Sequence, residues 1–599
     1  MDQQAFKKMV LLFDITYHLA KHELPFSYFP ALANLEKRHG VNLGTTYLNP
    51  VQAHMFTEFL AEDIRQEIDY TVRKSRYISI LIDGSTDRSS LEQELMYIKY
   101  LDLDDGIPRT RFFGIHDVEN ATADGVLQAV DSIFNQHTHP DWKNNLVAFC
   151  ADGASVNFGC RGGVVTKLQN EMPWVVGIHC IAHRLELAAK DAFKDTFFTK
   201  EIDSFLSTYA AFYRKSPKRV RELHDMADLL NEQILRPTRA DGTRWVEHRR
   251  RALKALDRNY VAVTAHLVEL GSEQRADVKK EDAAKARGML KKMSTQTFIY
   301  HMALYMDILE ELSQVSLVFQ IEDSSLAEVV EVLGTTVKVV QDMCNKDGPH
   351  LHSVKRKCLD DGSYRGHSLT GFTAGHAEFD ASRPACLEPL IRCLEERFSS
   401  FKDSRIFEAV TSLNPTTWPE DLKDLDDKVD DGVRVLIDHF ETPLVAHGCD
   451  PAAVMAEWIR LKKVLQMYFK PGMSWKNLWG TLFRRRQNDF PNFFHVMEIV
   501  QVLPFATAIV ERGFSLMNRI KTDWRVRLHT TTLDDLMAIS LEGPAEETYT
   551  TDSAVTRWFK AGKTTRRPWV EPYGPRPADA THATESDHSD DSESGPSQD

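Results

Sequence analysis

The chain has 599 residues, of which 42% are hydrophobic and 27% charged, a balance typical of globular proteins and a length sufficient for several domains. No apolar run reaches membrane-spanning length, which excludes a segment that crosses a bilayer, and the net charge of −14 argues against a protein that coats nucleic acid without specificity. Asp14, His18 and Lys21 interrupt the apolar positions of residues 1–25, which predicts an amphipathic helix and not a signal peptide. We therefore expect an intracellular protein, cytosolic or nuclear.

Eight cysteines are scattered along the chain without any Cys-x-x-Cys pair. This distribution predicts reduced thiols and argues against a zinc finger or a dithiol redox motif. Charge is unevenly distributed: bases cluster at 249–251 and 484–486, and acids dominate after Asp579. A local basic cluster can bind phosphates even on an acidic chain, although each cluster taken alone fits a solvated helix face better.

Residues 1–73 follow a helical pattern, with apolar side chains at helical spacing from Phe56 to Ile68. We identify no zinc ligands and no DNA-reading motif in this region. The sequence therefore predicts an N-terminal helical region without a recognisable binding function.

After this region the period of the apolar residues changes to that of β-strands. Short apolar runs predict strands at 77–82, 94–102, 109–118, 146–151 and 175–180. The first three follow one another closely enough for an antiparallel meander, and helical patterns precede the fourth, separate it from the fifth, and follow the fifth. The order β-β-β-α-β-α-β-α predicts an α/β fold with a mixed sheet and flanking helices.

Residues 210–495 are helical in pattern almost throughout, which predicts a large all-α insertion. We expect a loop at 343–385, where Gly, Pro, His and Ser interrupt the pattern, and a capping box at Ser325-Leu-Ala-Glu328. Amphipathic helix returns over 496–545. The composition beyond it predicts a disordered acidic tail at 546–599.

Two aspartates, Asp83 and Asp152, stand directly after predicted buried strands. Carboxylates at strand ends project into a crevice, and two of them side by side can hold a hard divalent cation through oxygen. Such a site activates water or a hydroxyl for displacement at a phosphodiester. Asp-Gly is also a common turn dipeptide, and for either aspartate alone this simpler interpretation is preferable. The strand order, which brings the first and fourth strands together, favours the metal site for the pair.

Five motifs occur along the chain and carry a family resemblance. They are DGSTD at 83–87, ADGAS at 151–155, CIAHRLELA at 180–188, TRW at 243–245 and ERGFSLMNRIKT at 511–522. Together they resemble the hAT superfamily of DNA transposases, in particular the group that includes domesticated vertebrate genes. The resemblance extends from about residue 60 to 545. It implies an RNase-H-like fold whose last helix is separated from the sheet by an all-helical insertion.

The resemblance also implies a catalytic, metal-binding triad of acidic residues. Asp83 and Asp152 match its first two members, and Glu511 on the late helix matches the third. The implied cofactor is Mg²⁺ or Mn²⁺, and the implied reaction is hydrolysis and strand transfer at DNA phosphodiesters. Without the motif, a surface glutamate paired with Arg512 or Arg519 is the simpler interpretation of Glu511.

Two further groups take roles from the resemblance. Cys180 and His183 match a Cys-x-x-His pair that the family places near its active site. Two ligands cannot form a structural zinc site. A buried cysteine beside a hydrogen-bonding histidine explains the pair equally well. One tryptophan matches a residue that stacks on an exposed DNA base, and neighbouring arginines suit phosphate contacts; the alternative is a core tryptophan of a helical bundle. The DNA-binding candidates are Trp245, Arg244, Arg249, Arg250 and Arg251.

The chain departs from the family pattern at two places. Ser85 stands where many members have tryptophan, and we find no N-terminal zinc-binding BED finger of the kind that autonomous transposases carry. We therefore weigh a transposase-like DNA-binding protein with a DDE-type site against a non-catalytic nuclear descendant that acts as a DNA-associated or dimerising module in transcriptional regulation. A helical scaffold without a nucleic-acid role is the third interpretation.

The expected partners are DNA and a second copy of the chain, with no membrane association and a nuclear location. Self-association is expected through about 458–545, where the aromatic residues Trp475, Trp479, Phe483, Phe493 and Phe494 form either core or an interface patch. The expected domains are an N-terminal helical region (1–73), the first part of the RNase-H-like core (74–210), the helical insertion (211–495), the final helix with the dimerisation region (496–545) and the tail (546–599).

Overall fold

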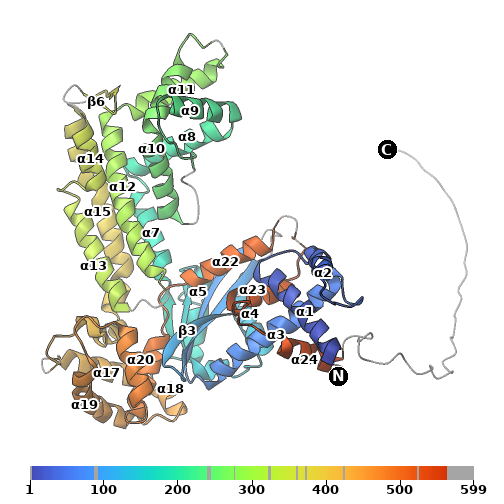
Figure 1. Ribbon diagram of the computed structural model, residues 1–599. Coiled ribbons are helices and arrows are strands. Elements are labelled where there is room, and N and C mark those ends of the chain that lie inside the picture. The colour runs from blue at the N-terminus through green and yellow to red at the C-terminus, as the bar shows by residue number, and fades with distance from the viewer. Residues whose placement is uncertain are drawn as a thin grey trace, which may run out of the picture.

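The computed structural model describes residues 3–86, 92–238, 240, 244–275, 277–321, 326–358, 362–371, 374–422, 425, 427–522, 525 and 527–562. A sheet flanked by helices lies at its centre, and a long helical bundle extends away from it (Figure 1). The expected capping box begins outside the described residues, and so does the part of the expected tail from residue 563. Within the described ranges, every helix is too short or too polar to cross a bilayer.

Five strands form the central sheet in the order β3-β2-β1-β4-β5 (Figure 1). β1 pairs antiparallel with β2, and β2 with β3, whereas β4 and β5 add in parallel on the other side of β1. The predicted fold class, a mixed sheet of RNase-H-like order with flanking helices and a long all-helical region, is confirmed. The strands are β1 Ile78–Thr86, β2 Glu92–Asp102, β3 Ile107–Asp117, β4 Leu146–Ala151 and β5 Val176–His179.

Side chains alternate across the sheet and enter two separate cores. On β1, Ile80 and Ile82 belong to the core under α4 and α6, while Leu81 belongs to a larger core shared with the C-terminal helices. Every residue of β4 is buried because helices cover both faces of the sheet. The helices on the first face are α4 Ala123–Gln136, α5 Ser155–Phe158 and α6 Val164–Glu171, and the short helix η2 Trp142–Asn145 precedes β4.

Two helices from late in the chain cover the second face. α21 (Pro491–Val502) and α22 (Ala508–Ile520) both contact β1 and β2. Gly513 permits the close approach of α22, because an added Cβ would lie 2.5 Å from Leu95 Cδ2. The sheet is therefore completed by residues that follow the insertion.

The helices α7 to α20 separate β5 from α21. α10, α12, α13 and α15 form a long bundle, and α8, α9 and α11 lie at its end furthest from the sheet (Figure 1). Their bounds are α7 Ile181–Phe193, η3 Phe198–Asp203, α8 Ser204–Arg214, α9 Pro217–Leu229, α10 Trp245–Gly271, α11 Lys280–Met293, α12 Gln296–Phe319, α13 Leu326–Asp342, α14 Pro349–Lys357, α15 Ala374–Asp403, α16 Arg405–Ser412, η4 Pro415–Thr417, α17 Asp427–His439, α18 Glu441–Ala446, α19 Pro451–Tyr468 and α20 Trp475–Arg486.

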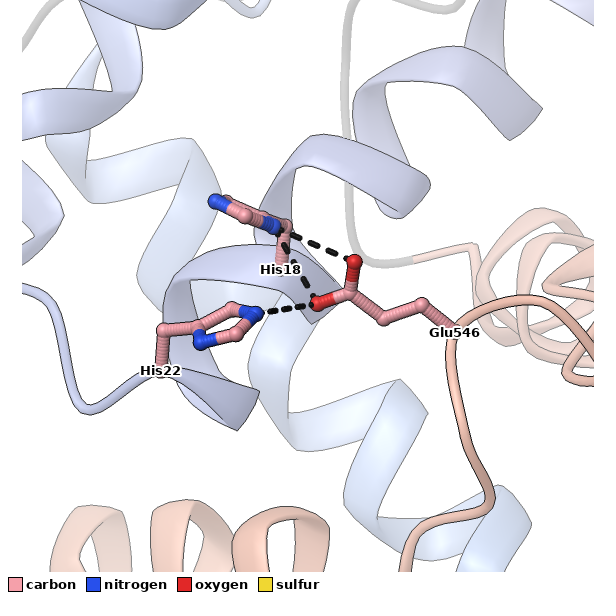
Figure 2. Close-up of side chains that lie close together, drawn as sticks. All are labelled: His18, His22 and Glu546. Carbon is pink, nitrogen blue, oxygen red and sulfur yellow. Dashed lines mark hydrogen bonds and ion pairs between the residues drawn. The ribbon is translucent and has the colours of Figure 1, made fainter.

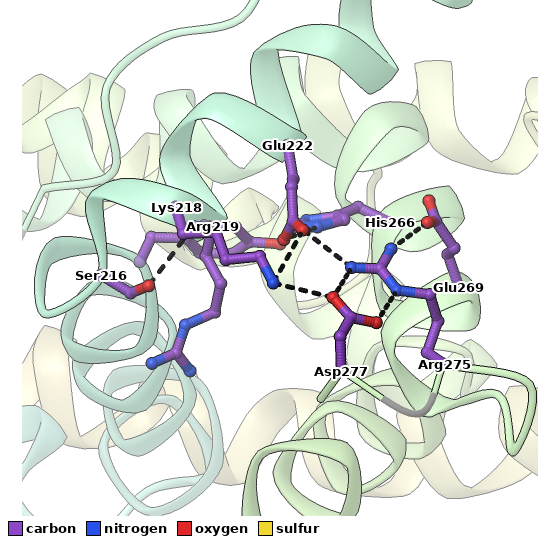
Figure 3. A network of polar contacts seen from close by, with 9 residues as sticks. Ser216, Lys218, Arg219, Glu222, His266, Glu269, Arg275 and Asp277 are labelled. Carbon is purple, nitrogen blue, oxygen red and sulfur yellow. Dashed lines mark hydrogen bonds and ion pairs between the residues drawn. The ribbon is translucent and has the colours of Figure 1, made fainter. Parts of the chain in front are cut away.

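A polar network fixes the far end of this insertion (Figure 3). Arg275, in the turn after α10, pairs with Glu222 of α9 at 2.7 Å and with Asp277 at 2.8 Å. Lys218 also reaches Asp277, at 2.7 Å. Hydrogen bonds from Arg275 and then Lys218 hold the pKa of Asp277 below its usual range. The network joins the turn after α10 to α9, and its charged side chains form ion pairs with one another.

The loop expected at 343–385 is largely structured, so that prediction was wrong. α14 buries Leu351 and Val354 in the bundle, and the strands β6 (Ser363–Tyr364) and β7 (His367–Ser368) form a short hairpin. α15 begins at Ala374 and continues through Pro384. Proline removes a backbone donor and normally ends a helix, which is why the sequence pattern indicated a loop.

The N-terminal helices and the last described helix pack against each other beside the sheet (Figure 1). Trp558 lies among Phe13, Tyr47 and Phe56, at ring separations of 5.5 to 6.2 Å. The prediction of disorder from residue 546 was therefore wrong for α24, the last described helix. This helix is short, and tertiary contacts stabilise it more than the helix propensity of its residues does. The helices of this group are α1 Gln3–Lys21, η1 Phe26–Tyr28, α2 Phe29–Arg38, α3 Pro50–Lys74, α23 Thr530–Glu542 and α24 Asp552–Ala561.

Helix α23 covers the outer edge of the sheet. The edge strand β3 directs amide groups outward, and the amide of Ile115 donates to Asp534 at 3.2 Å. The amide of Phe112 donates to Glu542 at 2.6 Å. Arg65 of α3 pairs with Asp534 at 2.7 Å. Because these carboxylates occupy the free edge, a strand of another chain cannot add there.

The aromatic residues expected either in the core or at a dimer interface lie in the core. Trp479, Phe483, Phe493 and Phe494 are buried, and Trp475 packs against Trp479 with ring centroids 6.0 Å apart. Packing within one chain therefore accounts for the aromatic density of this region.

Candidate functional site

Asp83, within β1, and Asp152, directly after β4, occupy neighbouring positions just beyond the point where the parallel pairing of β1 with β4 ends. The two strands run parallel with Leu81 opposite Cys150, and each aspartate follows two residues later. Burial raises the pKa of Asp83 to about 7, with further increases from the charges of Asp152 and Glu511. The structure therefore brings the three predicted acids to one region of the sheet.

The turn after β4 holds Asp152 in place. Its Oδ1 accepts a hydrogen bond from the amide of Ala154 at 3.1 Å and another from the side chain of Asn157 at 2.8 Å. Both hydrogen bonds fix the orientation of the carboxylate. Asn157, which the sequence analysis did not single out, thus positions Asp152.

Glu511 lies in the first turn of α22 and is 34% exposed. It pairs with Arg244, whose Nη2 and Nε lie 2.8 and 2.9 Å from the same carboxylate oxygen. This partner comes from the insertion, at the start of α10, and is neither Arg512 nor Arg519. Arg519 instead pairs with Glu23 at 2.7 Å.

The three acids share a region but do not meet at one point. Among the described residues, Asp83, Asp152 and Glu511 do not each place an oxygen within 4.8 Å of the other two. A single Mg²⁺ with oxygen ligands at about 2.1 Å draws those oxygens to roughly 3–4 Å of one another. Two ions about 4 Å apart accept a wider set of ligands. Arg244 holds the Glu511 carboxylate toward the insertion, which is consistent with the wider spacing.

Glu94 of β2 is a fourth carboxylate of this region, and the sequence analysis missed it. It pairs with Gly84, and its Oε1 would lie 2.8 Å from a Cβ at that glycine. Burial, followed by the charges of Asp83 and Asp152, raises the pKa of Glu94 to about 8. Its Oε2 is buried without a hydrogen-bond partner among the described residues. A buried oxygen of this kind, beside carboxylates that oppose ionisation, fits a site for a hard cation.

His179 closes the same edge of the sheet at the end of β5. Its ring covers Gly153, where an added Cβ would lie 2.2 Å from Cε1. Burial, followed by the positive charges of Arg184 and His183, lowers the pKa of His179 to about 4, so the ring is neutral at physiological pH. Its Nε2 is buried without a hydrogen-bond partner in the described part of the chain.

Cys180 joins the end of β5 to the start of α22. Its amide donates to the carbonyl of Ala151 at 2.9 Å, and its sulfur accepts from the amide of Thr507 at 3.3 Å. Burial raises the pKa of the Cys180 thiol, which therefore stays protonated. His183 lies one turn into α7, with its ring centroid 5.7 Å from that of His179. Cys180 is thus buried and hydrogen-bonded, and the role of the Cys180–His183 pair beside the active site stays a prediction.

Trp245 packs as a core residue. Its ring stacks on Phe193 at 5.5 Å, the guanidinium of Arg249 lies 4.0 Å from its ring centroid, and only 8% of the residue is exposed. The ring therefore has no open face for a DNA base in this conformation, and the bundle-core interpretation describes its surroundings.

The arginines around Trp245 all engage acidic side chains. Arg244 holds Glu511, as described above, and the other three pair within the insertion. Arg251 is the most exposed of the four, at 55%. The three pairs are Arg249 with Asp203 at 2.8 Å, Arg250 with Glu247 at 2.8 Å and with Glu310 at 3.2 Å, and Arg251 with Glu247 at 3.2 Å.

Glu186 extends the acidic region into the insertion. Its Oε2 accepts the amide of Val246 at 3.0 Å and so caps the start of α10. Burial raises the pKa of Glu186 to about 7; the Val246 hydrogen bond lowers it, and the charge of Glu511 raises it. Glu186 thus ties α7 to the helix that presents Arg244.

The site residues that were not predicted differ in how far the sequence alone could indicate them. His179 ends β5 but lies one residue inside the predicted strand 175–180, so the rule that selected Asp152 passed over it. Glu94 required the register of the β1–β2 hairpin, which the sequence pattern does not supply. Glu186 required the contact between α7 and α10, which is tertiary.

Comparison with known families agrees with this geometry over the first part of the sheet. Residues 44–158 match the family of RNase-like domains of the ZMYM1/FAM200 type (DUF4371), a transposase-derived RNase-like domain family. The matched segment contains β1 to β4 and both Asp83 and Asp152, and it ends before the insertion and Glu511. This part of the chain is therefore similar to RNase-like domains of that type.

Proposed function

We propose that this protein is a hAT transposase-like, DNA-binding protein with a DDE-type site for hydrolysis and strand transfer at phosphodiesters. Asp83, Asp152 and Glu511 form the acidic triad of this proposal, and Glu94 supports it. The observation that carries the proposal is that Asp83 and Asp152 follow Leu81 and Cys150, which stand opposite each other on parallel strands, beside the buried and unpartnered Oε2 of Glu94 among the described residues. Burial, with the charges of Asp152 and Glu511, raises the pKa of Asp83 to about 7. Carboxylates that oppose one another's ionisation at strand ends are typical of cation sites.

The donor set fits Mg²⁺ or Mn²⁺. The acids offer oxygen ligands only, and the buried Oε2 of Glu94 has no hydrogen-bond partner among the described residues. When bound, the cation supplies charge stabilisation at the phosphodiester and a lowered pKa of water.

The chain's own residues have distinct tasks in this scheme. Asp83 and Asp152 would hold the cation, with Asn157 fixing the orientation of Asp152 through its 2.8 Å hydrogen bond. Glu94, whose pKa is about 8, holds a proton at neutral pH and releases it when positive charge arrives. His179 stays neutral and keeps a ring nitrogen available beside Asp152.

The ion pair between Arg244 and Glu511 defines a resting arrangement in this proposal. A DNA phosphate that takes Arg244 as its partner frees the Glu511 carboxylate to turn toward the aspartates. Arg251 is exposed on the same helix and suits a phosphate contact once DNA replaces Glu247.

The alternative function is that of a domesticated, non-catalytic nuclear protein that acts as a DNA-associated or dimerising module in transcriptional regulation. The burial of Trp245 and the pairing of its neighbouring arginines favour this alternative, because they leave the predicted DNA contacts engaged within the chain.

The proposal includes DNA and a second copy of the chain as partners, and the nucleus as location. Self-association through the C-terminal region rests on the family resemblance, since the aromatic residues of that region are buried within the chain. Molar mass by light scattering tests it. A monomer at every concentration examined would remove the dimer from the proposal.

The enzymatic claim is tested with DNA nicking and strand transfer in Mg²⁺ or Mn²⁺. Asp152→Asn should abolish product, while Asp195→Asn, an exposed aspartate away from the site, should leave it unchanged. Equal product from wild type and Asp152→Asn overturns the catalytic site, and absence of product in both, with DNA binding retained, selects the non-catalytic alternative.

A further inference from the structure

Two histidines of the N-terminal helix face a glutamate from the other end of the chain (Figure 2). His18 lies in the last turn of α1, His22 stands one turn later, and Glu546 follows α23. His18 Nδ1 is 3.1 Å from Glu546 Oε1, and His22 Nε2 is 2.9 Å from the same oxygen. Among the described residues, this is the only group of three His, Cys, Asp or Glu whose ligand atoms all lie within 4.8 Å of one another.

The spacing of these atoms fits a small tetrahedral cation. Zinc bound at about 2.0–2.1 Å separates its tetrahedral ligands by roughly 3.3 Å. The nitrogen–oxygen separations, 2.9 to 3.3 Å, already lie close to this value. Histidines four residues apart share one side of a helix, as metal-binding pairs require. All three side chains are at least 36% exposed, which gives an ion access and leaves room for a water ligand.

Residues around the three side chains hold α1 and the segment after α23 together. Tyr17 donates its hydroxyl proton to the carbonyl of Pro544 at 2.6 Å, and Lys21 donates to the carbonyl of Ser540 at 3.1 Å. The rings of Tyr17 and Tyr549 lie 4.3 Å apart. The α1 helix and the segment after α23 are therefore joined before any ion binds, which lowers the ordering cost of binding.

We propose that His18, His22 and Glu546 form a binding site for a divalent transition-metal ion of the zinc class. Two imidazoles and one carboxylate suit Zn²⁺, Co²⁺ or Ni²⁺, whereas Mg²⁺ prefers oxygen alone. The bound ion fastens the N-terminal helix to the C-terminal helices. The third ligand lies 528 positions from His18, so residues 1–73 alone show no set of zinc ligands.

The site also stands next to the helix that carries Glu511. Glu23, directly after His22, pairs with Arg519 of α22 at 2.7 Å. An ion that fixes the end of α1 therefore also restricts the loop that contacts α22.

The test uses the full-length protein, freed of metal, with ZnCl₂ in competition with a chromophoric chelator. Wild type should bind one Zn²⁺ that is lost, or weakened at least about tenfold, in His18→Ala, His22→Ala and Glu546→Gln. The exposed His39→Ala is the matched control and should bind as wild type does. Co²⁺ should give the visible absorption of a tetrahedral site in wild type and lose it in the three variants.

Two further measurements control for unfolding and for Zn²⁺ binding at the acidic site. Circular dichroism without metal should show that the variants fold, since the three side chains are exposed. Asp152→Asn should retain Zn²⁺ binding, which separates this site from the acidic site of the sheet. Equal Zn²⁺ binding by wild type and the His18→Ala/His22→Ala double variant, or no binding by wild type, overturns the proposal.

Discussion

Arg244 and Glu511 lie 267 positions apart in the sequence and form an ion pair in which both Nε and Nη2 contact one carboxylate oxygen. The pair joins the first residue before α10 of the insertion to the first turn of α22 on the sheet. The insertion therefore reaches directly into the acidic region instead of merely interrupting the domain.

Removing Arg244 should strengthen cation binding at the acidic site. Arg244→Ala frees Glu511, and because a partly exposed ion pair contributes about 0.2–1 kcal/mol, we expect roughly a 1.4- to fivefold gain in Mn²⁺ affinity. Calorimetric titration with Mn²⁺ measures this gain. Arg251→Ala, which removes an equally charged exposed residue of α10, should show no gain; a gain of the same size there would point to net charge instead of the specific pair.

Stability in metal-free buffer should fall as pH rises from about 4 to about 8. The folded protein holds the protons of Asp83 and Glu94, whose pKa values are about 7 and about 8, more tightly than an unfolded chain does. Their contribution to stability is therefore complete below the unfolded pKa values of about 4, and is lost as pH rises from there through the folded values. Asp83→Asn should remove part of the decline, up to about 4 kcal/mol at alkaline pH.

Thermal unfolding of wild type and Asp83→Asn with EDTA, across this pH range, provides the measurement. Added Mg²⁺ should restore the stability of wild type at alkaline pH but restore less in the variant. Parallel curves for the two proteins at all pH values would contradict the assignment.

Trp245→Ala should destabilise the protein strongly because the ring is enclosed by Phe193 and Arg249. Loss of a buried tryptophan costs about 3–5 kcal/mol, and chemical denaturation would show it. The exposed Arg251→Ala on the same helix should change stability by less than about 0.5 kcal/mol. A small loss for Trp245→Ala, together with weakened DNA binding, would instead favour the base-stacking role.

Helix α24 should be required for the stability of the N-terminal region. A chain that ends after Thr550 loses Trp558 and its contacts with Phe13 and Phe56, and we expect a loss of about 3 kcal/mol or more. A chain that ends after Gly562 keeps the helix and should unfold at the wild-type temperature. Differential scanning calorimetry compares the two, and identical transitions would show that α24 does not contribute.

Asp534→Ala should both destabilise the fold and promote association of chains. It removes one of the two carboxylates of Arg65, which keeps Asp535 at 2.7 Å, and it leaves the amide of Ile115 without its acceptor, a loss that costs about 1–3 kcal/mol. It also opens the edge of β3. Unfolding and light scattering give the two readouts. Asp438→Ala, an exposed aspartate on α17, serves as the control and should affect neither.

The sheet could be predicted from the sequence because its strands are short apolar runs with clear ends. The runs at β1 and β4 also placed Asp83 and Asp152 correctly at one edge. The prediction ended the first strand at Ile82, whereas β1 continues to Thr86 through pairing with β2. That extension, and with it Glu94, depends on hairpin register and not on hydrophobicity.

The residues that the sequence could not place are those whose surroundings come from distant segments. Trp245 fitted both a core position and a stacking platform until Phe193 was found beside it. α24 follows an acidic, polar segment. Its few apolar side chains become buried only through contacts with α1 and α3, which the sequence pattern does not show. Glu511 had two candidate partners nearby in sequence, and its partner came from the insertion.

The carboxylates of α23 on the edge of β3 have a consequence for how the chain is made. During translation β5 is complete several hundred residues before Asp534 and Glu542 leave the ribosome, a delay of tens of seconds at roughly 5–20 residues per second. Throughout that interval the nascent sheet has an open edge and an uncovered apolar face. The newborn chain must therefore depend on chaperones, or on slow pairing of its strands, until its final helices arrive.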